Sequence, residues 1–166
     1  KLKKHFIIYK YMEEKNFGKL GSSFQQALIK SIIEDKKYGD TIIDVIESKY
    51  FDNNSFKFIM ENLKELFKTY NTIPDYNTIA QKIMTENDNK ESARIHLDTL
   101  ELIKENKQDS GFVKDTALNF CKQQNLKKEQ DSRRTLEKII NTESNSRNAL
   151  KLRVAELTKQ YDNLNQ

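Results

Sequence analysis

The stretch NNSFKFIMENLKELFKTY, residues 53–70, decides the fold. It starts with Asn53, Asn54 and Ser55, short polar side chains that can accept hydrogen bonds from the free N–H groups of a first helical turn. Its apolar residues then recur every three or four positions, which places them along one face of an α-helix. These residues are Phe56, Ile59, Met60, Leu63, Leu66, Phe67 and Tyr70. We predict an amphipathic helix with this face buried.

The same helical pattern recurs on both sides of this stretch. Ser23 and Gln26 form a capping box, which predicts that a helix begins at Ser23. Asp40 is expected to cap a short helix that follows. Pro74 should close the central helix and occupy the first turn of the next one, because proline disfavours the helical conformation in the residue before it. Further apolar stripes predict helices near residues 76–83, 95–103 and 113–124.

The composition supports an all-α fold. One proline and four glycines in 166 residues leave few obligatory breaks, and the abundant Glu, Lys, Leu, Ile and Gln favour helix. No stretch approaches the roughly 18 consecutive apolar residues that a membrane span needs. Cys121 is the single cysteine, which excludes an internal disulfide and suits a reducing compartment. We therefore expect a soluble cytoplasmic protein, located in the host cytoplasm if the chain is viral.

The residues that catalysis or cofactor binding would need are scattered. The sequence lacks a G-x-x-x-x-G-K-[ST] phosphate-binding loop, so we expect no ATP hydrolysis. His5 and His96 lie far apart in sequence and neither has a neighbouring cysteine, which argues against a metal site. Cys121 falls on an apolar stripe, where cysteine acts as a small hydrophobic residue. We expect no catalytic, cofactor-binding or metal-binding residue in this chain.

The densest basic segment holds Lys127, Lys128, Arg133 and Arg134, which are the candidate residues for contact with nucleic acid. The net charge of +4 permits such contact without requiring it. Acidic residues interrupt the segment, so we favour a solvated helix face over a dedicated binding site. A small independent nucleic-acid-binding protein that uses these four residues is a competing hypothesis.

The last helical segment, residues 146–166, shows a different spacing. Its apolar positions alternate between steps of four and three, the spacing of a coiled-coil seam, and they are Leu150, Val154, Leu157, Tyr161 and Leu164. Five positions fall short of the three to four heptads that would identify a coiled coil. A helix packed on its own domain explains the pattern equally well.

Two segments carry a resemblance to a known family. The first is FGKLGSSFQQALIKSIIEDKKYGDTIIDVIESKYFDNNSFKFIMENLKELFKTYNTIPDYNTI, residues 17–79. In it a first helix is followed by a short helix ending in Tyr50-Phe51-Asp52, and then by a helix that opens at Asn54-Ser55-Phe56 and closes at the turn from Asn71 to Pro74. The second segment is SGFVKDTALNFCKQQNLKK, residues 110–128. In this order of features the chain resembles the amino-terminal collar domain of DnaB-type replicative helicases, especially those of T-even-like phages.

The resemblance implies an all-α fold, in which a compact multi-helix DnaB N-terminal-like domain is followed by a helical hairpin or extension. The implied parts are an N-terminal extension (1–16), a globular collar domain (17–107), a hairpin region (108–142) and a C-terminal helix that forms a linker or a coiled-coil-like segment (143–166). The sequence departs from the family pattern after Lys128, where only a short apolar stripe follows in place of a complete hairpin.

The resemblance also implies which residues would join two copies of the chain. By position in the hairpin region, the candidate oligomer interface consists of Phe112, Val113, Leu118, Phe120 and Cys121. The alternative is that these residues fill the core of their own domain.

In function, the resemblance implies a non-catalytic oligomerisation domain of a DNA helicase that acts in DNA replication. The implied partners are further copies of the chain, from dimer to hexamer, together with primase, a helicase loader and single-stranded DNA, and no membrane. ATP and Mg²⁺ would belong to a motor domain absent from this sequence, so only the full-length protein would be an ATP-dependent helicase. The alternative is a helicase loader or adaptor protein with a collar-like helical fold.

Overall fold

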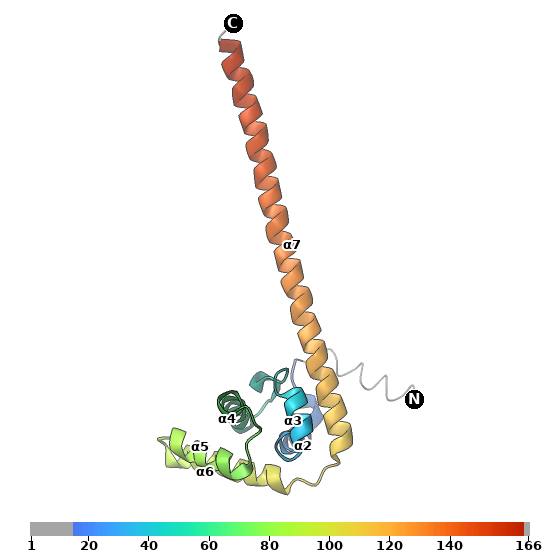
Figure 1. Cartoon of the computed structure of the whole chain (residues 1–166), viewed down its shortest axis with the longest axis vertical. Coiled ribbons are helices and arrows are strands. Elements are labelled where there is room, and N and C mark those ends of the chain that lie inside the picture. The colour runs from blue at the N-terminus through green and yellow to red at the C-terminus, as the bar shows by residue number, and fades with distance from the viewer. Residues whose placement is uncertain (1–14, 165–166) are drawn as a thin grey trace, which may run out of the picture. The chain divides into compact units, whose positions relative to one another are not determined.

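The computed structural model describes residues 15–164, and over these residues it contains helices and no strands (Figure 1). The all-α fold class is therefore confirmed. The elements are η1 (Gly18–Leu20), α2 (Gly21–Glu34), α3 (Lys36–Ile42), η2 (Ser48–Tyr50), α4 (Asn54–Tyr70), α5 (Tyr76–Glu86), α6 (Lys90–Glu105) and α7 (Ser110–Leu164), where η marks a short 3₁₀ helix. Most of the N-terminal extension predicted for residues 1–16 lies outside the described residues.

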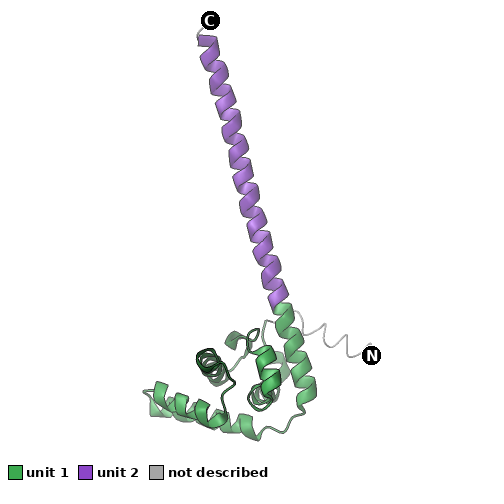
Figure 2. Cartoon of the chain, viewed as in Figure 1, with its two compact units in different colours: residues 1–124 green, residues 125–166 purple. Residues whose placement is uncertain are grey.

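The chain forms two compact units, unit 1 (residues 1–124) and unit 2 (residues 125–166) (Figure 2). This boundary differs from the predicted divisions after residues 107 and 142. The hairpin predicted for residues 108–142 is also wrong, because α7 is one uninterrupted helix over Ser110–Leu164. The physical reason lies in the sequence, which has no glycine after Gly111 and no proline after Pro74 to break the helix.

Helix α4 matches the prediction made from residues 53–70. The Asn53 side chain accepts hydrogen bonds from the backbone N–H of Ser55 (2.7 Å) and of Phe56 (3.4 Å). The helix ends at Asn71, whose φ of 54° is the left-handed conformation that often terminates helices. Five of the seven predicted apolar positions are buried and Phe67 is partly buried, whereas Tyr70 in the last turn is exposed.

Three of the predicted helix starts are wrong, and at Ser23 a tertiary contact takes the side chain concerned. Helix α2 begins at Gly21, and the hydroxyl of Ser23 donates to Gln108 Oε1 (2.8 Å) instead of capping it. Asp35, rather than Asp40, caps α3 by accepting from the N–H of Tyr38 (3.1 Å). Asp75 caps α5, so Pro74 precedes the cap and does not occupy the first turn.

An aromatic cluster joins the first described residues of unit 1 to the start of α7. The Phe120 ring of α7 lies 4.7 Å from the Phe17 ring and 5.1 Å from the Tyr50 ring, measured between centroids. Phe17 also contacts Phe51 (5.4 Å) and Phe24 (5.7 Å). All five rings are buried, and each contributes about 1.5–3 kcal/mol by burial. The core therefore depends on contacts between segments about a hundred residues apart in the sequence.

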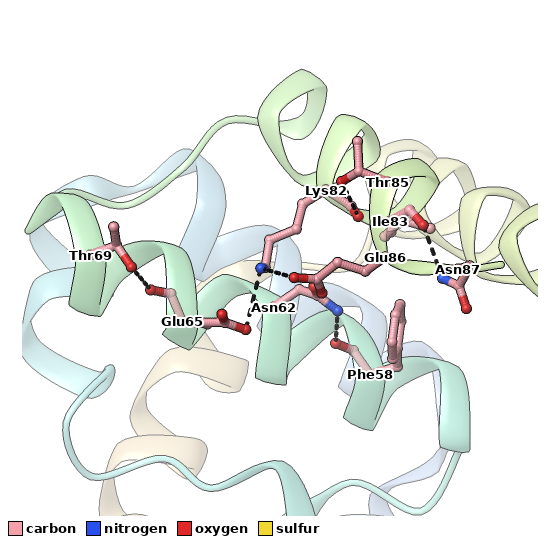
Figure 3. Close-up of polar contacts among 9 residues, drawn as sticks. All are labelled: Phe58, Asn62, Glu65, Thr69, Lys82, Ile83, Thr85, Glu86 and Asn87. Atoms are coloured by element: carbon pink, nitrogen blue, oxygen red, sulfur yellow. Dashed lines mark hydrogen bonds and ion pairs between the residues drawn. The ribbon is translucent and has the colours of Figure 1, made fainter.

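Polar contacts add to the packing of α4 against α5 (Figure 3). Lys82 of α5 places its Nζ 3.2 Å from Glu65 Oε2 of α4 and also donates to Glu86 of its own helix. The hydrogen bond to Glu86 is the largest cause of the raised pKa of Lys82. Asn62 and Asn87 each donate to the backbone carbonyl four residues earlier, at Phe58 and Ile83. This cluster pairs its charges internally and fits a structural role.

Gly39 allows α3 to lie close to α2. A Cβ added at Gly39 would lie 2.6 Å from the carbonyl oxygen of Ile32 and 2.9 Å from Ile73 Cγ1. We expect Gly39→Ala to destabilise the domain by about 1–3 kcal/mol, because the backbone of α2 would have to move. Thermal unfolding followed by circular dichroism measures the effect.

Gly111→Ala is the matched control for this prediction. Gly111 lies in the first turn of α7, and a Cβ there would have Asp109 Oδ1 at 3.7 Å as its nearest neighbour. Alanine should be neutral or slightly stabilising at this site. Equal unfolding temperatures for Gly39→Ala and the unmodified protein would contradict the packing argument.

Candidate self-association surface

The predicted oligomer interface is largely interior. Val113, Phe120 and Cys121 are buried in the core of unit 1, and Leu118 is partly buried against it. Only Phe112 is exposed, with 49% of its surface accessible. The prediction is corrected for the three buried residues, which form the α7 side of the domain core, because α7 turns this face toward the aromatic cluster.

The Cys121 thiol lies within this core. Burial raises its pKa to about 12, so it stays protonated at neutral pH and is a poor nucleophile. Its side chain is fully enclosed, which matches the prediction that it acts as a small hydrophobic residue.

A groove of about 430 Å³ lies between α2 and the turn from α6 to α7. Lys30, Asp35 and Lys114 of its lining are already engaged. Lys30 Nζ donates to the carbonyl oxygens of Lys104 and Asn106, each at 2.8 Å. Lys114 Nζ lies 2.7 Å from Asp35 Oδ2, and this hydrogen bond is the largest cause of the lowered pKa of that carboxyl group. These contacts attach the start of α7 to α2 and leave no charged side chain aimed at a ligand among the groups named.

The four basic residues of the nucleic-acid prediction are all exposed but do not share one face. Lys127 and Arg134 are seven residues apart and lie on the same side of α7, whereas Lys128 is turned about 100° from Lys127 around the helix. Arg133 lies on another face, and Arg134 lies 3.8 Å from Asp131 as an ion pair. Of the four residues, only Lys127 and Arg134 therefore share a face.

The most unusual surface is the exposed apolar side of α7 in unit 2. Every residue from Leu126 to Leu164 is exposed. Large apolar side chains among them are Leu126, Leu136, Ile139, Ile140, Leu150, Leu152, Val154, Leu157, Tyr161 and Leu164. A solvated helix does not need so many apolar groups, which makes this side of α7 the candidate interaction surface.

Most of these side chains fit a single heptad register. Counting in alternating steps of four and three back from Leu164 reaches eight apolar residues on one face: Leu126, Leu136, Ile140, Leu150, Val154, Leu157, Tyr161 and Leu164. The other four positions of the same face are charged: Glu129, Arg133, Glu143 and Arg147. We call these twelve positions the seam. In the sequence the apolar spacing is continuous only from Leu150 onward, because charged residues interrupt it before that point.

His96 of α6 is a further titratable group with a specific environment. Its ring stacks on Phe58 of α4, with 4.2 Å between centroids, and its two nitrogens face the hydroxyls of Ser55 (3.0 Å) and Ser92 (3.4 Å). Partial burial lowers its pKa below the usual value of 6.5. The arrangement joins α6 to α4.

A pH effect on stability follows from His96. Since its pKa is lower in the folded state, the unfolded chain takes up the proton more readily. The contribution to stability is complete above about pH 6.5 and is lost as the pH falls through the lower folded value. We expect the melting temperature to fall between pH 7.5 and 5.5 in the unmodified protein.

His96→Gln should show a smaller fall over the same range. His5 is common to both proteins, and Asp35 and Asp75, whose pKa values are lowered, titrate below this window. Parallel melting-temperature profiles for the two proteins would show that His96 does not couple to folding.

Comparison of this chain with protein-family models, curated proteins and solved structures finds no match. Among residues 15–164, no helix combines the length and apolar character needed to cross a bilayer. Within the same residues, no group of three or more His, Cys, Asp or Glu side chains is arranged to hold a metal ion. The fold of unit 1 and the seam of α7 are therefore the observations on which a functional proposal can rest.

Proposed function

We propose that this chain is a non-catalytic self-association domain, namely the amino-terminal collar domain of a DnaB-type replicative helicase. The observation that carries the proposal is the seam of α7. Isolated helices gain little stability from local propensity alone and depend on packing of an apolar face. Each large apolar seam residue would gain about 1.5–3 kcal/mol if it were fully buried against another helix. A second protein surface is the natural partner for such a helix.

The helicase assignment is supported by the order of elements in unit 1. Helix α2 is followed by the short α3 and by η2, which ends at Tyr50 ahead of Phe51 and Asp52. Helix α4 then opens at Asn54 and is terminated by Asn71. This is the order on which the resemblance to the DnaB collar rests. In this proposal ATP and Mg²⁺ belong to a separate motor domain, and primase and a helicase loader are the protein partners.

Contact with single-stranded DNA is part of the same proposal. Lys127, Lys128 and Arg134 lie off the seam, so they would stay accessible to phosphate groups while the seam is occupied by another helix. Arg133 lies on the seam and is assigned to the protein interface instead. The collar would thus present basic groups beside the helix that joins the copies.

Light scattering over a concentration series of the whole chain tests self-association. We expect a dimer or a larger assembly that dissociates on dilution. Leu136→Lys should shift the equilibrium to monomer, because it places a charge on the seam. Leu152→Lys is the matched control: Leu152 is also an exposed leucine of α7, at 73% against 58% for Leu136, but lies off the seam.

Addition of a separately expressed DnaB-type helicase separates the proposed function from its alternative. A collar domain should self-associate and should not bind the collar of an intact helicase. A strict monomer that instead binds intact helicase would overturn the proposal and favour the loader or adaptor. A monomer that binds neither would also overturn it.

A further inference from the structure

The charged seam positions follow a repeat. Leu126, Glu129, Arg133 and Leu136 are followed, fourteen residues later, by Ile140, Glu143, Arg147 and Leu150. Both groups read apolar, acidic, basic, apolar along one face of α7. A charge at a seam position is costly if it is buried without a partner, but it can select one helix orientation if a partner is supplied.

The repeat is self-complementary when two copies of α7 run antiparallel. In an antiparallel coiled coil, each a position of the heptad faces a d position of the other helix. If the two helices cross symmetrically about residue 138, Glu129 faces Arg147 and Arg133 faces Glu143 of the other copy. The apolar positions then pair with one another, Leu126 with Leu150 and Leu136 with Ile140. Every one of the eight seam positions between 126 and 150 meets a matching side chain.

A parallel dimer lacks this match. In a parallel dimer each seam residue faces the same residue of the other chain. Arg133 and Arg147 would then each face an arginine, and Glu129 and Glu143 would each face a glutamate. Like charges in direct opposition disfavour a pairing, and this pairing would contain four such layers. Pairing between neighbouring layers relieves only part of the repulsion.

Shifted antiparallel registers are also poorer. After a shift of one heptad in either direction, each charged seam position from 129 to 147 faces an apolar residue or a like charge of the other copy. A shift of two heptads toward the C-terminus pairs Leu126 with Leu164 and Ile140 with Leu150, but it sets Arg133 against Leu157 and Glu129 against Tyr161. Burial of an unpaired charge lowers affinity by roughly a hundredfold or more, so the register centred on residue 138, which pairs all four charged positions between 126 and 150, is preferred over the two-heptad shift, which pairs only Glu143 with Arg147. Beyond residue 150 the preferred register sets Val154 and Tyr161 opposite Lys122 and Asp115, which are exposed.

The side chains that flank the seam agree with this register. Ile139 is exposed beside the seam and would face its own copy at the centre, next to Leu136 and Ile140. Six apolar side chains would meet there. The ion pair between Arg153 Nη1 and Glu156 Oε2 (2.9 Å) lies off the seam and would stay in place. Glu137 would approach Glu137 of the other chain at the solvent-exposed edge of the pairing. The repulsion between two exposed carboxylates lowers the affinity only slightly.

We propose that two copies of this chain associate through an antiparallel pairing of α7, centred on residue 138 and specified by the Glu129–Arg147 and Arg133–Glu143 pairs between chains. This inference rests on the self-association part of the proposed function and adds the orientation, the register and the residues that select them. The partner is a second copy of the chain, because the complementary pattern is present within the one sequence.

Thiol cross-linking of the whole chain tests the register. Leu126→Cys and Leu150→Cys are made as separate variants and are then expressed together, and a short bis-maleimide is added. We expect a cross-linked dimer only from the mixture. In the proposed pairing Leu126 of one chain lies about 36 Å from Leu126 of the other, and the same distance separates the two Leu150 residues. Neither variant alone should therefore be cross-linked. Cys121 stays in place, since it is buried and its pKa is raised to about 12.

Each other outcome overturns the inference. Cross-linking of each variant with itself would show a parallel pairing. Linkage between Ile140→Cys and Leu150→Cys in place of the expected pair would show the register shifted by two heptads. A dimer in light scattering without any of these cross-links would refute the antiparallel seam while leaving the proposed self-association intact. A monomer at all concentrations would refute both.

Charge exchange gives an independent measurement of the same pairing. Arg133→Glu should weaken the dimer at least tenfold, because it sets glutamate against Glu143 of the other copy. Adding Glu143→Arg should recover most of the affinity. The matched control combines Arg133→Glu with Glu129→Arg, which restores the spacing of opposite charges along one helix but leaves both cross-chain pairs repulsive. In a parallel dimer this control would recover affinity and the first combination would not.

Discussion

The packing of Phe120 against Phe17 and Tyr50 is the contact on which the rest of the structure depends. It connects the first described turn of the chain, the 3₁₀ turn before α4 and the start of α7. These segments are distant in sequence, so the entropy of closing the chain between them must be offset by burial of large aromatic surfaces. Once this cluster forms, the orientation of α7 about its own axis within unit 1 is fixed.

That orientation gives α7 two different apolar stripes. Along its first turns, Val113, Ala117, Phe120 and Cys121 face the core. The seam positions that continue backward from Leu126 are Lys122, Asn119, Asp115 and Phe112, and all four are exposed. The helix therefore buries one face in its own domain and leaves a different face exposed. This separation explains how the domain core can be complete while the seam stays available.

The distinction between the two stripes also explains where the sequence interpretation failed. A buried stripe and an interface stripe have the same composition, so Val113, Phe120 and Cys121 were equally compatible with either role. From the sequence the seam is visible only from Leu150 onward, because the charged residues Arg147 and Glu143 interrupt the apolar spacing. Charged residues within a seam are informative only when the register is known, and the register became clear once α7 proved to be uninterrupted.

By itself, the sequence determined the all-α class, the buried face of α4 and its Asn53 cap, because these follow from local spacing and from side chains that act on their own backbone. The tertiary structure decided that Ser23 and Gln26 do not form the capping box of α2, since both side chains contact the α6–α7 turn at Gln108 and Asn106. It also decided which face of α7 is interior. That choice depends on contacts between residues about a hundred positions apart, which no local pattern can specify.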